Sequence, residues 1–255
     1  MLKQSFMGSL AQDWDNVLGA LPKFDRDEAL ENLTLVIPAK NESESLPLVL
    51  KEIFDLKLEL QIKVCLEKKD IQTINSIQNF DIEIFYQNKI GYGAALIEGI
   101  NSVKTDFFCI FNADGSFNPI ELEEMYKKIN LGKSEMIFAS RYMKDSGSDD
   151  DTIITLIGNY IFSKIGQIFF KLPISDILYT FVMGKTKIFK KINFKKNDFG
   201  LCVELPIKCH QNKYNITEIK SWERPRIDGV KKVKAFKDGA IILSDMIKLF
   251  FKKDV

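Results

Sequence analysis

The chain has 255 residues, of which 45% are hydrophobic and 28% are charged. A chain of this size and composition can bury a sizeable core, which excludes a disordered protein or a coiled coil. Its longest apolar runs, LTLVI at 33–37 and FFCIF at 107–111, are far shorter than the roughly 18–20 residues that a membrane span requires. The first residues lack a cationic stretch followed by an unbroken apolar one, so no signal peptide is predicted. We therefore expect a cytoplasmic protein.

Charge is divided unevenly along the chain although the formal net charge is only +1. Residues 185–255 carry 18 Lys and Arg against 8 Asp and Glu, whereas residues 1–184 carry 18 against 27. The basic quarter could face phosphates, an anionic membrane surface or simply solvent. Nucleic acid is not expected as a partner, because the aromatic residues there are not arranged as a stacking surface.

The cysteines and the histidine offer little chemistry. Cys65, Cys109, Cys202 and Cys209 form no CxxC pair, and the first two lie inside apolar runs, so we expect reduced, buried thiols. His210 is the only histidine, which leaves almost nothing for a histidine-based zinc site or a Ser-His-Asp triad.

Short apolar runs alternate with helix-compatible stretches from residue 33 onward. The predicted strands cover 33–37, 62–66, 82–86, 106–111 and 135–139. The first predicted helix has one apolar face, formed by Leu46, Val49, Leu50, Ile53 and Phe54. This alternation predicts an α/β fold with a mostly parallel sheet flanked by helices.

A helix start follows the fourth predicted strand. Asn118 can cap it, Pro119 suits the first helical position and Glu121 completes the signal. The expected core face comprises Leu122, Met125, Tyr126 and Ile129. The segment NADGSFN must then be a loop at the carboxyl end of the strand, where open α/β sheets bind ligands.

The chain after Arg141 has a different character. The stretch KDSGSDDDT predicts a mobile loop, and 153–172 predicts an amphipathic helix interrupted by Gly158, Lys164 and Gly166, either packed in the core or lying at a membrane interface. We expect a helical extension at 1–31, a core at 32–145, a further part of the same domain at 146–239, and an amphipathic basic helix at 240–255.

Two loops have compositions suited to a nucleotide. After the first strand, Pro38 fixes a turn, and Asn41 and Glu42 supply oxygens for base and ribose hydroxyls. Gly91 and Gly93 open a helix, where small residues allow close approach of a ligand and free N–H groups attract an anion, although simple turn glycines fit equally well.

Two further loops have compositions suited to a diphosphate. Asn112 and Asp114 place two oxygen-bearing side chains at a strand exit, which suits a divalent cation; an Asx turn with a helix cap is the alternative. The stretch RPRIDGVKK at 224–232 combines arginines for bidentate phosphate contact with lysines, although such a run is also common in solvated loops.

Taken in order, these segments resemble the GT-A glycosyltransferases of family 2, most closely the branch of dolichol- and polyprenol-phosphate mannosyl- or glucosyltransferases. The resemblance covers about residues 32–245. It rests on LVIPAKNESESLP, NKIGYGAALIEGI, FNADGSFNP, FASRY, IGNYIFSKIGQIFFKLPISDILYTF and ERPRIDGVKK, which match the family's motifs in the family's order.

The resemblance implies a GT-A (Rossmann-like) fold, in which residues 32–145 form a nucleotide-sugar-binding core and residues 146–239 form the C-terminal, acceptor-side part of the same domain. It also implies inverting transfer of a hexose from a UDP- or GDP-sugar, helped by Mg²⁺ or Mn²⁺. By position, the nucleotide-binding residues are Pro38, Ala39, Asn41, Glu42, Glu67, Gly91 and Gly93. The metal and diphosphate residues are Asn112, Asp114 and Ser116, and the phosphate or acceptor residues are Arg226, Lys232 and Arg141. The catalytic candidates are Asp114, Glu204, Arg226 and Asp176, with a paired carboxylate at a helix edge as the alternative for Glu204.

The sequence departs from the family at four places. The usual acidic run after the second strand is absent, so only Glu67 or Asp70 can replace its contact with the base. Asn112 replaces the first aspartate of the metal motif, Lys231 replaces a serine of the basic loop, and Thr180 stands where glycine is common. A catalytically silent nucleotide-sugar-binding protein is therefore an alternative to an active transferase.

The acceptor is predicted to be a polyprenyl phosphate, with a glycan hydroxyl as the alternative. An ionised lipid phosphate needs no general base, whereas a hydroxyl requires a carboxylate such as Glu204 or Asp176. A lipid acceptor implies peripheral contact with the inner face of the membrane, or a membrane protein partner, through basic residues and the amphipathic segments.

Overall fold

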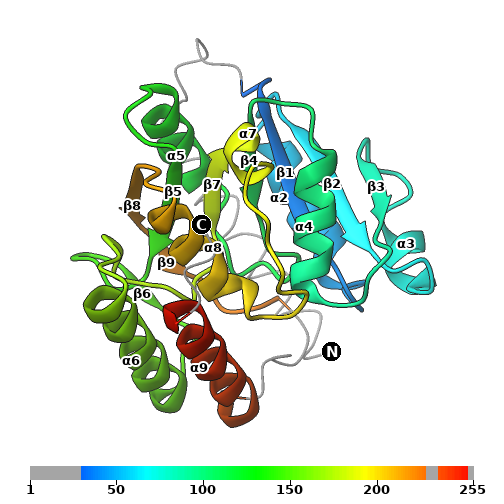
Figure 1. Cartoon of the computed structure of the whole chain (residues 1–255). Helices are drawn as coiled ribbons and strands as arrows, with labels where there is room; N and C mark the ends of the chain where they lie inside the picture. Colours follow the sequence, from blue (N-terminus) through cyan, green and yellow to red (C-terminus); the bar gives the residue numbers. More distant parts are fainter. Residues whose placement is uncertain (1–29, 228–234, 252–255) are drawn as a thin grey trace.

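The computed structural model describes residues 30–227 and 235–251 of the chain (Figure 1). The strands are β1 (Leu33–Pro38), β2 (Gln61–Leu66), β3 (Glu83–Tyr86), β4 (Phe107–Ile110), β5 (Met136–Ser140), β6 (Gly147–Ser148), β7 (Val182–Lys185), β8 (Ile216–Lys220) and β9 (Trp222–Glu223). The helices are α2 (Ser45–Asp55), α3 (Ile71–Ser76), α4 (Tyr92–Ser102), α5 (Glu121–Asn130), α6 (Ile153–Phe169), α7 (Thr186–Phe189), α8 (Leu201–Gln211) and α9 (Ala235–Phe251).

Seven strands form one twisted sheet in the order β3-β2-β1-β4-β7-β5-β8. All neighbours are parallel except β7, which runs antiparallel to both β4 and β5. The two short strands β6 and β9 pair in parallel beside it. The predicted fold class, a mostly parallel sheet flanked by helices, is confirmed.

Alternating side chains along the central strands separate two cores. Leu35 and Ile37 of β1 belong to one core, which α2 and α5 cover, whereas Val36 belongs to the other, which α4 and α8 cover. Both faces of the sheet are therefore buried, which explains why β1, β2 and β4 are mostly apolar and could be recognised in the sequence.

Two strands of the sheet were missed in the sequence. β8 reads ITEIK and has only two fully buried residues, so it lacks the apolar run that marks a central strand. β7 is four residues long and contains Gly184, where an added Cβ would lie 2.3 Å from the sulfur of Met136. Both strands come from the predicted acceptor-side part, so residues on either side of position 145 share one sheet.

The helices α2 and α5 differ slightly from expectation. In α2 the predicted face is buried except for Phe54, which is 42% exposed and stacks on Phe80. The helix α5 begins at Glu121, two residues later than predicted, because Asn118 forms a turn in which its Oδ1 accepts the N–H of Ile120 at 3.2 Å. The predicted core face of α5 is buried as expected.

The helix α6 differs more strongly from expectation. It is continuous over 17 residues, so the predicted interruptions were wrong; an outward-facing glycine such as Gly158 costs only about 1 kcal/mol in a helix. Only Ser163 and Gly166 are fully buried, while Phe162 and Ile165 are half-buried against the core, so one side of the helix packs on the protein and the rest is exposed. Within residues 30–227 and 235–251, no helix is long and apolar enough to cross a membrane.

At the C-terminal end, α9 begins five residues before the predicted basic helix and packs beside α6 and α8 (Figure 1). Most of the predicted extension at 1–31 and the last four residues of the chain lie outside the described residues.

Candidate active site

The carboxyl ends of β2, β1 and β4 lie side by side, because these strands are parallel neighbours. From β1 the chain builds β2 and β3 on one side, then returns to place β4 on the other. This reversal is the topological switch point at which open α/β sheets bind ligands. The loops that follow these three strands contain most of the predicted nucleotide and metal residues.

The loop after β1 is tied to the loop after β2. Asn41 has a left-handed backbone (φ 53°), and its N–H donates to Oδ2 of Asp70 at 2.7 Å. The N–H of Glu42 donates to Oγ1 of Thr73 at 3.0 Å, and its Oε2 accepts the hydroxyl of Ser45 at 2.7 Å. Asn41, Glu42 and Asp70 are thus brought together at the switch point.

Two lysines flank the carboxylate of Glu67 at the end of β2. Lys69 lies 2.7 Å and Lys40 lies 3.3 Å from its oxygens, and their hydrogen bonds hold the pKa of Glu67 below its usual value. Pro38 ends β1 and Ala39 is buried directly after it. Glu67 therefore stays ionised next to the β1 loop, where it could accept hydrogen bonds from a base.

Gly91 and Gly93 lie at the N-terminal end of α4, where their lack of a side chain lets another backbone segment of the protein pack closely. A Cβ on Gly91 would lie 2.0 Å from the carbonyl oxygen of Asn197, and one on Gly93 would lie 2.3 Å from that of Lys196. The N–H of Ala94 donates to the same Asn197 carbonyl at 3.0 Å. The expectation of free N–H groups for an anion here is corrected, because the segment 196–198 covers this end of α4.

The residues predicted to bind metal converge after β4. Oδ1 of Asp114 accepts both the N–H and the hydroxyl of Ser116, at 3.0 and 2.7 Å, and the amide of Asn112 donates to that hydroxyl at 3.4 Å. This is the Asx turn given as the alternative, and it orients Asp114. Oδ2 of Asp114 faces Nη1 of Arg226 at 3.2 Å, so the guanidinium of Arg226 already lies at the second carboxylate oxygen.

The basic segment after β9 lies along the β4 loop. The N–H of Arg224 donates to the carbonyl of Ser116 at 2.8 Å, and the N–H of Ile227 donates to that of Asp114 at 2.9 Å. Gly115 has φ +82°, and a Cβ there would lie 2.5 Å from Ile227, so only glycine fits between the segments. Lys232, predicted to contact phosphate, lies outside the described residues.

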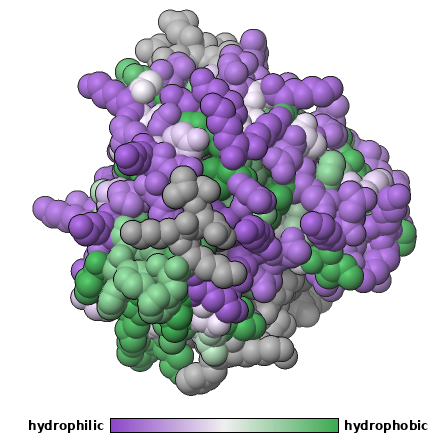
Figure 2. Space-filling view, in the orientation of Figure 1, coloured by the Kyte–Doolittle hydropathy of each residue, from purple (hydrophilic) through white to green (hydrophobic). Residues whose placement is uncertain are grey.

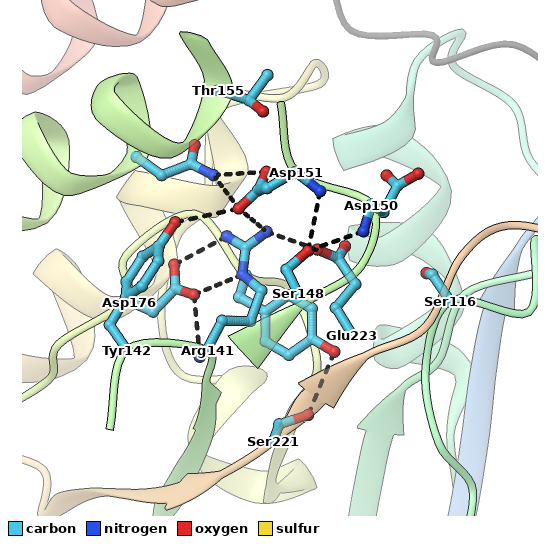
Figure 3. A network of polar contacts seen from close by, with 12 residues as sticks. Ser116, Arg141, Tyr142, Ser148, Asp150, Asp151, Thr155, Asp176, Ser221 and Glu223 are labelled. Carbon is cyan, nitrogen blue, oxygen red and sulfur yellow. Dashed lines mark hydrogen bonds and ion pairs between the residues drawn. The ribbon is translucent and has the colours of Figure 1, made fainter. Parts of the chain in front are cut away.

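Arg141 is not available to an acceptor in this structure. Its guanidinium forms a fork with Asp176, at 2.7 and 3.1 Å, and also contacts Glu223 at 2.9 Å and Asp151 at 3.6 Å (Figure 3). It also lies 4.6 Å above the ring of Tyr179. The role predicted for Arg141 as a phosphate ligand is therefore corrected: it is an internal cation that joins four segments of the chain.

Carboxylates outnumber cations in this region. Arg226 lies between Asp114 and Asp150, because its Nε also contacts Oδ2 of Asp150 at 3.2 Å. The backbone N–H of Asp150 donates to Ser148, whose hydroxyl donates to Glu223, so the Arg226 group lies next to the Arg141 group. Among the described residues, the two groups together contain five carboxylates and two guanidiniums: Asp114, Asp150, Asp151, Asp176, Glu223, Arg141 and Arg226. This excess of negative charge would favour an additional cation.

Glu204 has the arrangement of a structural carboxylate. Its side chain is buried, and it accepts the N–H groups of Lys195 and Lys196 at 2.9–3.1 Å. The ammonium of Lys208, one turn along α8, lies 2.9 Å from Oε1. These contacts match the paired carboxylate that the sequence offered as the alternative to a catalytic base.

Sequence reasoning missed the residues that hold the acidic loop in place. The stretch at 144–152 was predicted to be mobile, yet Trp222 donates to Asp149 at 2.8 Å, and the hydroxyl of Ser148 donates to Glu223 at 2.5 Å. The available signal was charge complementarity between DDD at 149–151 and ERPR at 223–226.

Glu121 lies beneath β9, next to this cluster. Its carboxyl accepts the hydroxyl of Ser221 at 2.5 Å and the N–H of Trp222 at 3.1 Å. Burial raises the pKa of Glu121 to about 7, against the smaller opposing effect of these hydrogen bonds. Its protonation state therefore changes near neutral pH.

Comparison with known proteins shows the family of this chain. Residues 34–193 match the sequence family described as glycosyl transferase family 2, which spans β1 to the end of α7. The chain belongs to this family. It is 22% identical over 210 residues to uncharacterized glycosyltransferases of Mycobacterium bovis and Mycobacterium tuberculosis, covering 82% of this chain and 93% of theirs.

Solved structures share its fold. Glucosyl-3-phosphoglycerate synthase from Mycobacterium tuberculosis, in complex with Mn²⁺, UDP and phosphoglyceric acid, superposes with a TM-score of 0.66 at 13% identity, over 87% of this chain and 79% of that one. Mannosyl-3-phosphoglycerate synthase from Rubrobacter xylanophilus gives 0.63 at 14% identity, over 85% and 72%. The family member is thus a glycosyltransferase with the GT-A fold.

Proposed function

We propose that this glycosyltransferase moves a hexose from a UDP- or GDP-linked sugar to a polyprenyl phosphate with the help of Mg²⁺ or Mn²⁺. The observation that carries the proposal is the carboxylate of Asp114 at the switch point, opposite the guanidinium of Arg226. The structural relatives crystallised with Mn²⁺ and UDP support the choice of cofactor and of donor class.

The residues after β4 fit a divalent cation. Asp114, Asn112 and Ser116 offer hard oxygen donors. The Arg226 guanidinium, 3.2 Å from Asp114, occupies a position in which a positive charge is stabilised by this carboxylate. In the described part of the chain, no group of three or more His, Cys, Asp or Glu side chains is placed to hold a metal alone. The cation would therefore be coordinated by the diphosphate as well as by the protein, and it would neutralise the charge of the diphosphate as that group leaves the sugar.

The loops after β1 and β2 would hold the nucleotide. Pro38, Ala39, Asn41 and Glu42 line the β1 loop, and Glu67 stands at the end of the neighbouring strand. Their carboxylate and amide oxygens suit the N–H groups of a base and the hydroxyls of a ribose. Gly91 and Gly93 contribute indirectly, because they let the segment 196–198 close the side of the fold next to α4.

A phosphate acceptor is favoured because both predicted general bases are engaged in the protein. Asp176 is fully buried in its fork with Arg141, and Glu204 accepts backbone N–H groups. An ionised phosphate oxygen attacks the anomeric carbon without losing a proton. The new bond forms as the carbon–oxygen bond to the nucleoside diphosphate breaks, and the bonding electrons leave with that diphosphate. Attack opposite the leaving group would invert the anomeric centre.

Arg226 would guide the acceptor or the diphosphate. Its guanidinium is 23% exposed and is held by Asp114 and Asp150 at 3.2 Å each, so it can exchange these partners for a phosphate. Lys232 belongs to the same basic stretch in the sequence and is proposed to assist. A small phosphate ester is the second candidate acceptor, because the structural relatives bind phosphoglyceric acid.

The test is release of nucleoside diphosphate from a panel of UDP- and GDP-sugars. Each reaction contains Mg²⁺ or Mn²⁺ and either a short polyprenyl phosphate, 3-phosphoglycerate or no acceptor. Asp114→Ala is the control, and its folding is checked by circular dichroism and thermal unfolding. We expect release that needs both metal and polyprenyl phosphate and that disappears in the control.

The other outcomes are equally informative. Turnover with 3-phosphoglycerate alone would assign the second acceptor. Thermal stabilisation by a nucleotide sugar without turnover under any condition would make the protein a silent binder, and an absence of any binding would contradict the assigned pocket.

A further inference from the structure

Two neighbouring helices expose an unusual amount of apolar surface. We name it the α6–α9 face, and Figure 2 shows hydrophobic residues gathered there, at the lower left of the view. Its members are Ile153, Ile154, Leu156, Ile157, Tyr160, Ile161, Ile168 and Phe169 of α6, and Ile241, Leu243, Ile247, Phe250 and Phe251 of α9. Monomeric soluble proteins rarely leave so large a contiguous apolar patch in water, so the face calls for a partner.

The helix α6 uses only a narrow side to pack on the protein. Ser163 is buried, and its hydroxyl oxygen accepts the N–H of Ile177 at 3.2 Å. Gly166 lies against Leu172 and Ile177, where an added Cβ would come within about 3 Å of both. Phe162 and Ile165 are half-buried and pack against the same core, whereas the opposite side of the helix points outward, including Ile153, which is 77% exposed.

The exposed surfaces of the two helices are continuous. The ring of Phe250 lies 5.9 Å from both Phe169 and Phe170, and Phe251 packs on Phe250 at 5.4 Å. Ile242 and Met246 of α9 are buried, so the same helix anchors itself in the core while its other side extends the face.

Exposed lysines border the middle and the C-terminal end of the face. Lys164 is the only charged residue in α6, and it is exposed, as is Lys171 just after the helix. On α9, Lys248 is 64% exposed and lies 3.8 Å from the buried Asp245, which also pairs with Lys196. The acidic residues at the N-terminal end of α6 are engaged by other groups of the protein: Asp149 by Trp222, Asp150 by Arg226 and Asp151 by Arg141. Apolar side chains bordered by lysines complement a surface of acyl chains and anionic headgroups.

The face begins at the candidate active site. Thr152 caps α6 with its hydroxyl, which accepts the N–H of Thr155 at 3.2 Å, and Ile153 is the first exposed member of the face. Asp150, two residues before the cap, is the partner of Arg226. A surface that covers the face would therefore lie next to the arginine that is proposed to receive a phosphate.

We propose that the α6–α9 face docks on an anionic lipid bilayer, with both helices lying in the plane of the interface. The inference rests on the proposed lipid acceptor for its purpose, since docking would deliver the phosphate of a membrane-embedded acceptor to Arg226. It does not depend on that acceptor for its test, because binding to lipid is measured without donor or acceptor.

The experiment is co-sedimentation of the full chain with vesicles. One set contains phosphatidylcholine with 30% phosphatidylglycerol, and the other contains phosphatidylcholine alone. The variant is Ile157→Glu with Ile161→Glu, which places two charges on the face. The matched control is Leu131→Glu, because Leu131 is 74% exposed just after α5, away from the face. Thermal unfolding with and without UDP and Mn²⁺ verifies the fold and the nucleotide site of each variant.

We expect the wild type and Leu131→Glu to bind anionic vesicles, with binding weakened by high salt and by omission of phosphatidylglycerol. The double variant should bind at least tenfold more weakly while its unfolding temperature and its stabilisation by UDP stay unchanged. Failure of the wild type to bind vesicles, or equal binding by the double variant, would overturn the proposal. A vesicle-free dimer seen by light scattering and lost in the double variant would assign the face to a second copy instead. In each case the UDP result reports separately on the proposed function.

Discussion

Replacing Arg141 by methionine should destabilise the fold strongly. The substitution removes three charge-assisted hydrogen bonds, two to Asp176 and one to Glu223, in a cluster whose side chains are at most 8% exposed. At roughly 1.5–3 kcal/mol per bond the gross loss is about 5–9 kcal/mol. Protonation of the stranded carboxylates and entry of water reduce the expected net loss to about 3–5 kcal/mol. For a chain of this size the unfolding temperature should fall by roughly 10 °C.

Urea unfolding at pH 7 measures this loss directly. Arg141→Lys should lose less, because it keeps the charge but not the planar fork. Lys127→Met is the exposed control: its pair with Glu123 on α5 should contribute only about 0.3–0.5 kcal/mol. A loss below about 1 kcal/mol for Arg141→Met, combined with loss of acceptor-dependent turnover, would refute the reasoning. Arg141 would then be the acceptor ligand that the sequence suggested.

Three further predictions follow from single side chains. Because burial raises the pKa of Glu121 to about 7, from 4.5, its contribution to stability is full below pH 4.5 and is lost as the pH rises through 7. Glu121→Gln should flatten this part of the stability profile in urea unfolding, and an unchanged slope would contradict it. Gly93→Ala should lower the free energy of unfolding by about 1–3 kcal/mol, because the added Cβ would overlap the Lys196 carbonyl. Thermal unfolding measures this loss, and a stability equal to that of the wild type would show that the segment 196–198 moves aside without cost. Glu204→Gln should lose about 2 kcal/mol yet keep its stabilisation by UDP, whereas full stability with lost turnover would make Glu204 the catalytic base.

Much of the fold and part of the site could be predicted from the sequence. The strands β1, β2 and β4 are buried on both faces by helices, so their residues are mostly apolar, and the polar loops after β1 and β4 are easily recognised in the sequence. Parallel neighbours end at the same edge, which is why Asn41, Glu42 and Asp114 could be placed at one edge of the sheet from their positions alone. Local signals of this kind depend only on residues close in the chain.

Only the tertiary structure decided which charged groups pair. Arg141 and Asp176 are separated by 35 residues, and Arg226 and Asp114 by more than 100, so no local pattern indicates that one pair is a buried fork and the other faces the loop after β4. The same applies to Gly93, whose close neighbour is a backbone carbonyl about 100 residues away rather than a ligand. The sequence by itself determined five of the seven strands of the main sheet, the order of the motifs and the resemblance to a family. Burial and pairing of charges required the fold, because the energy of a charge depends on its surroundings in space and not on its neighbours in the chain.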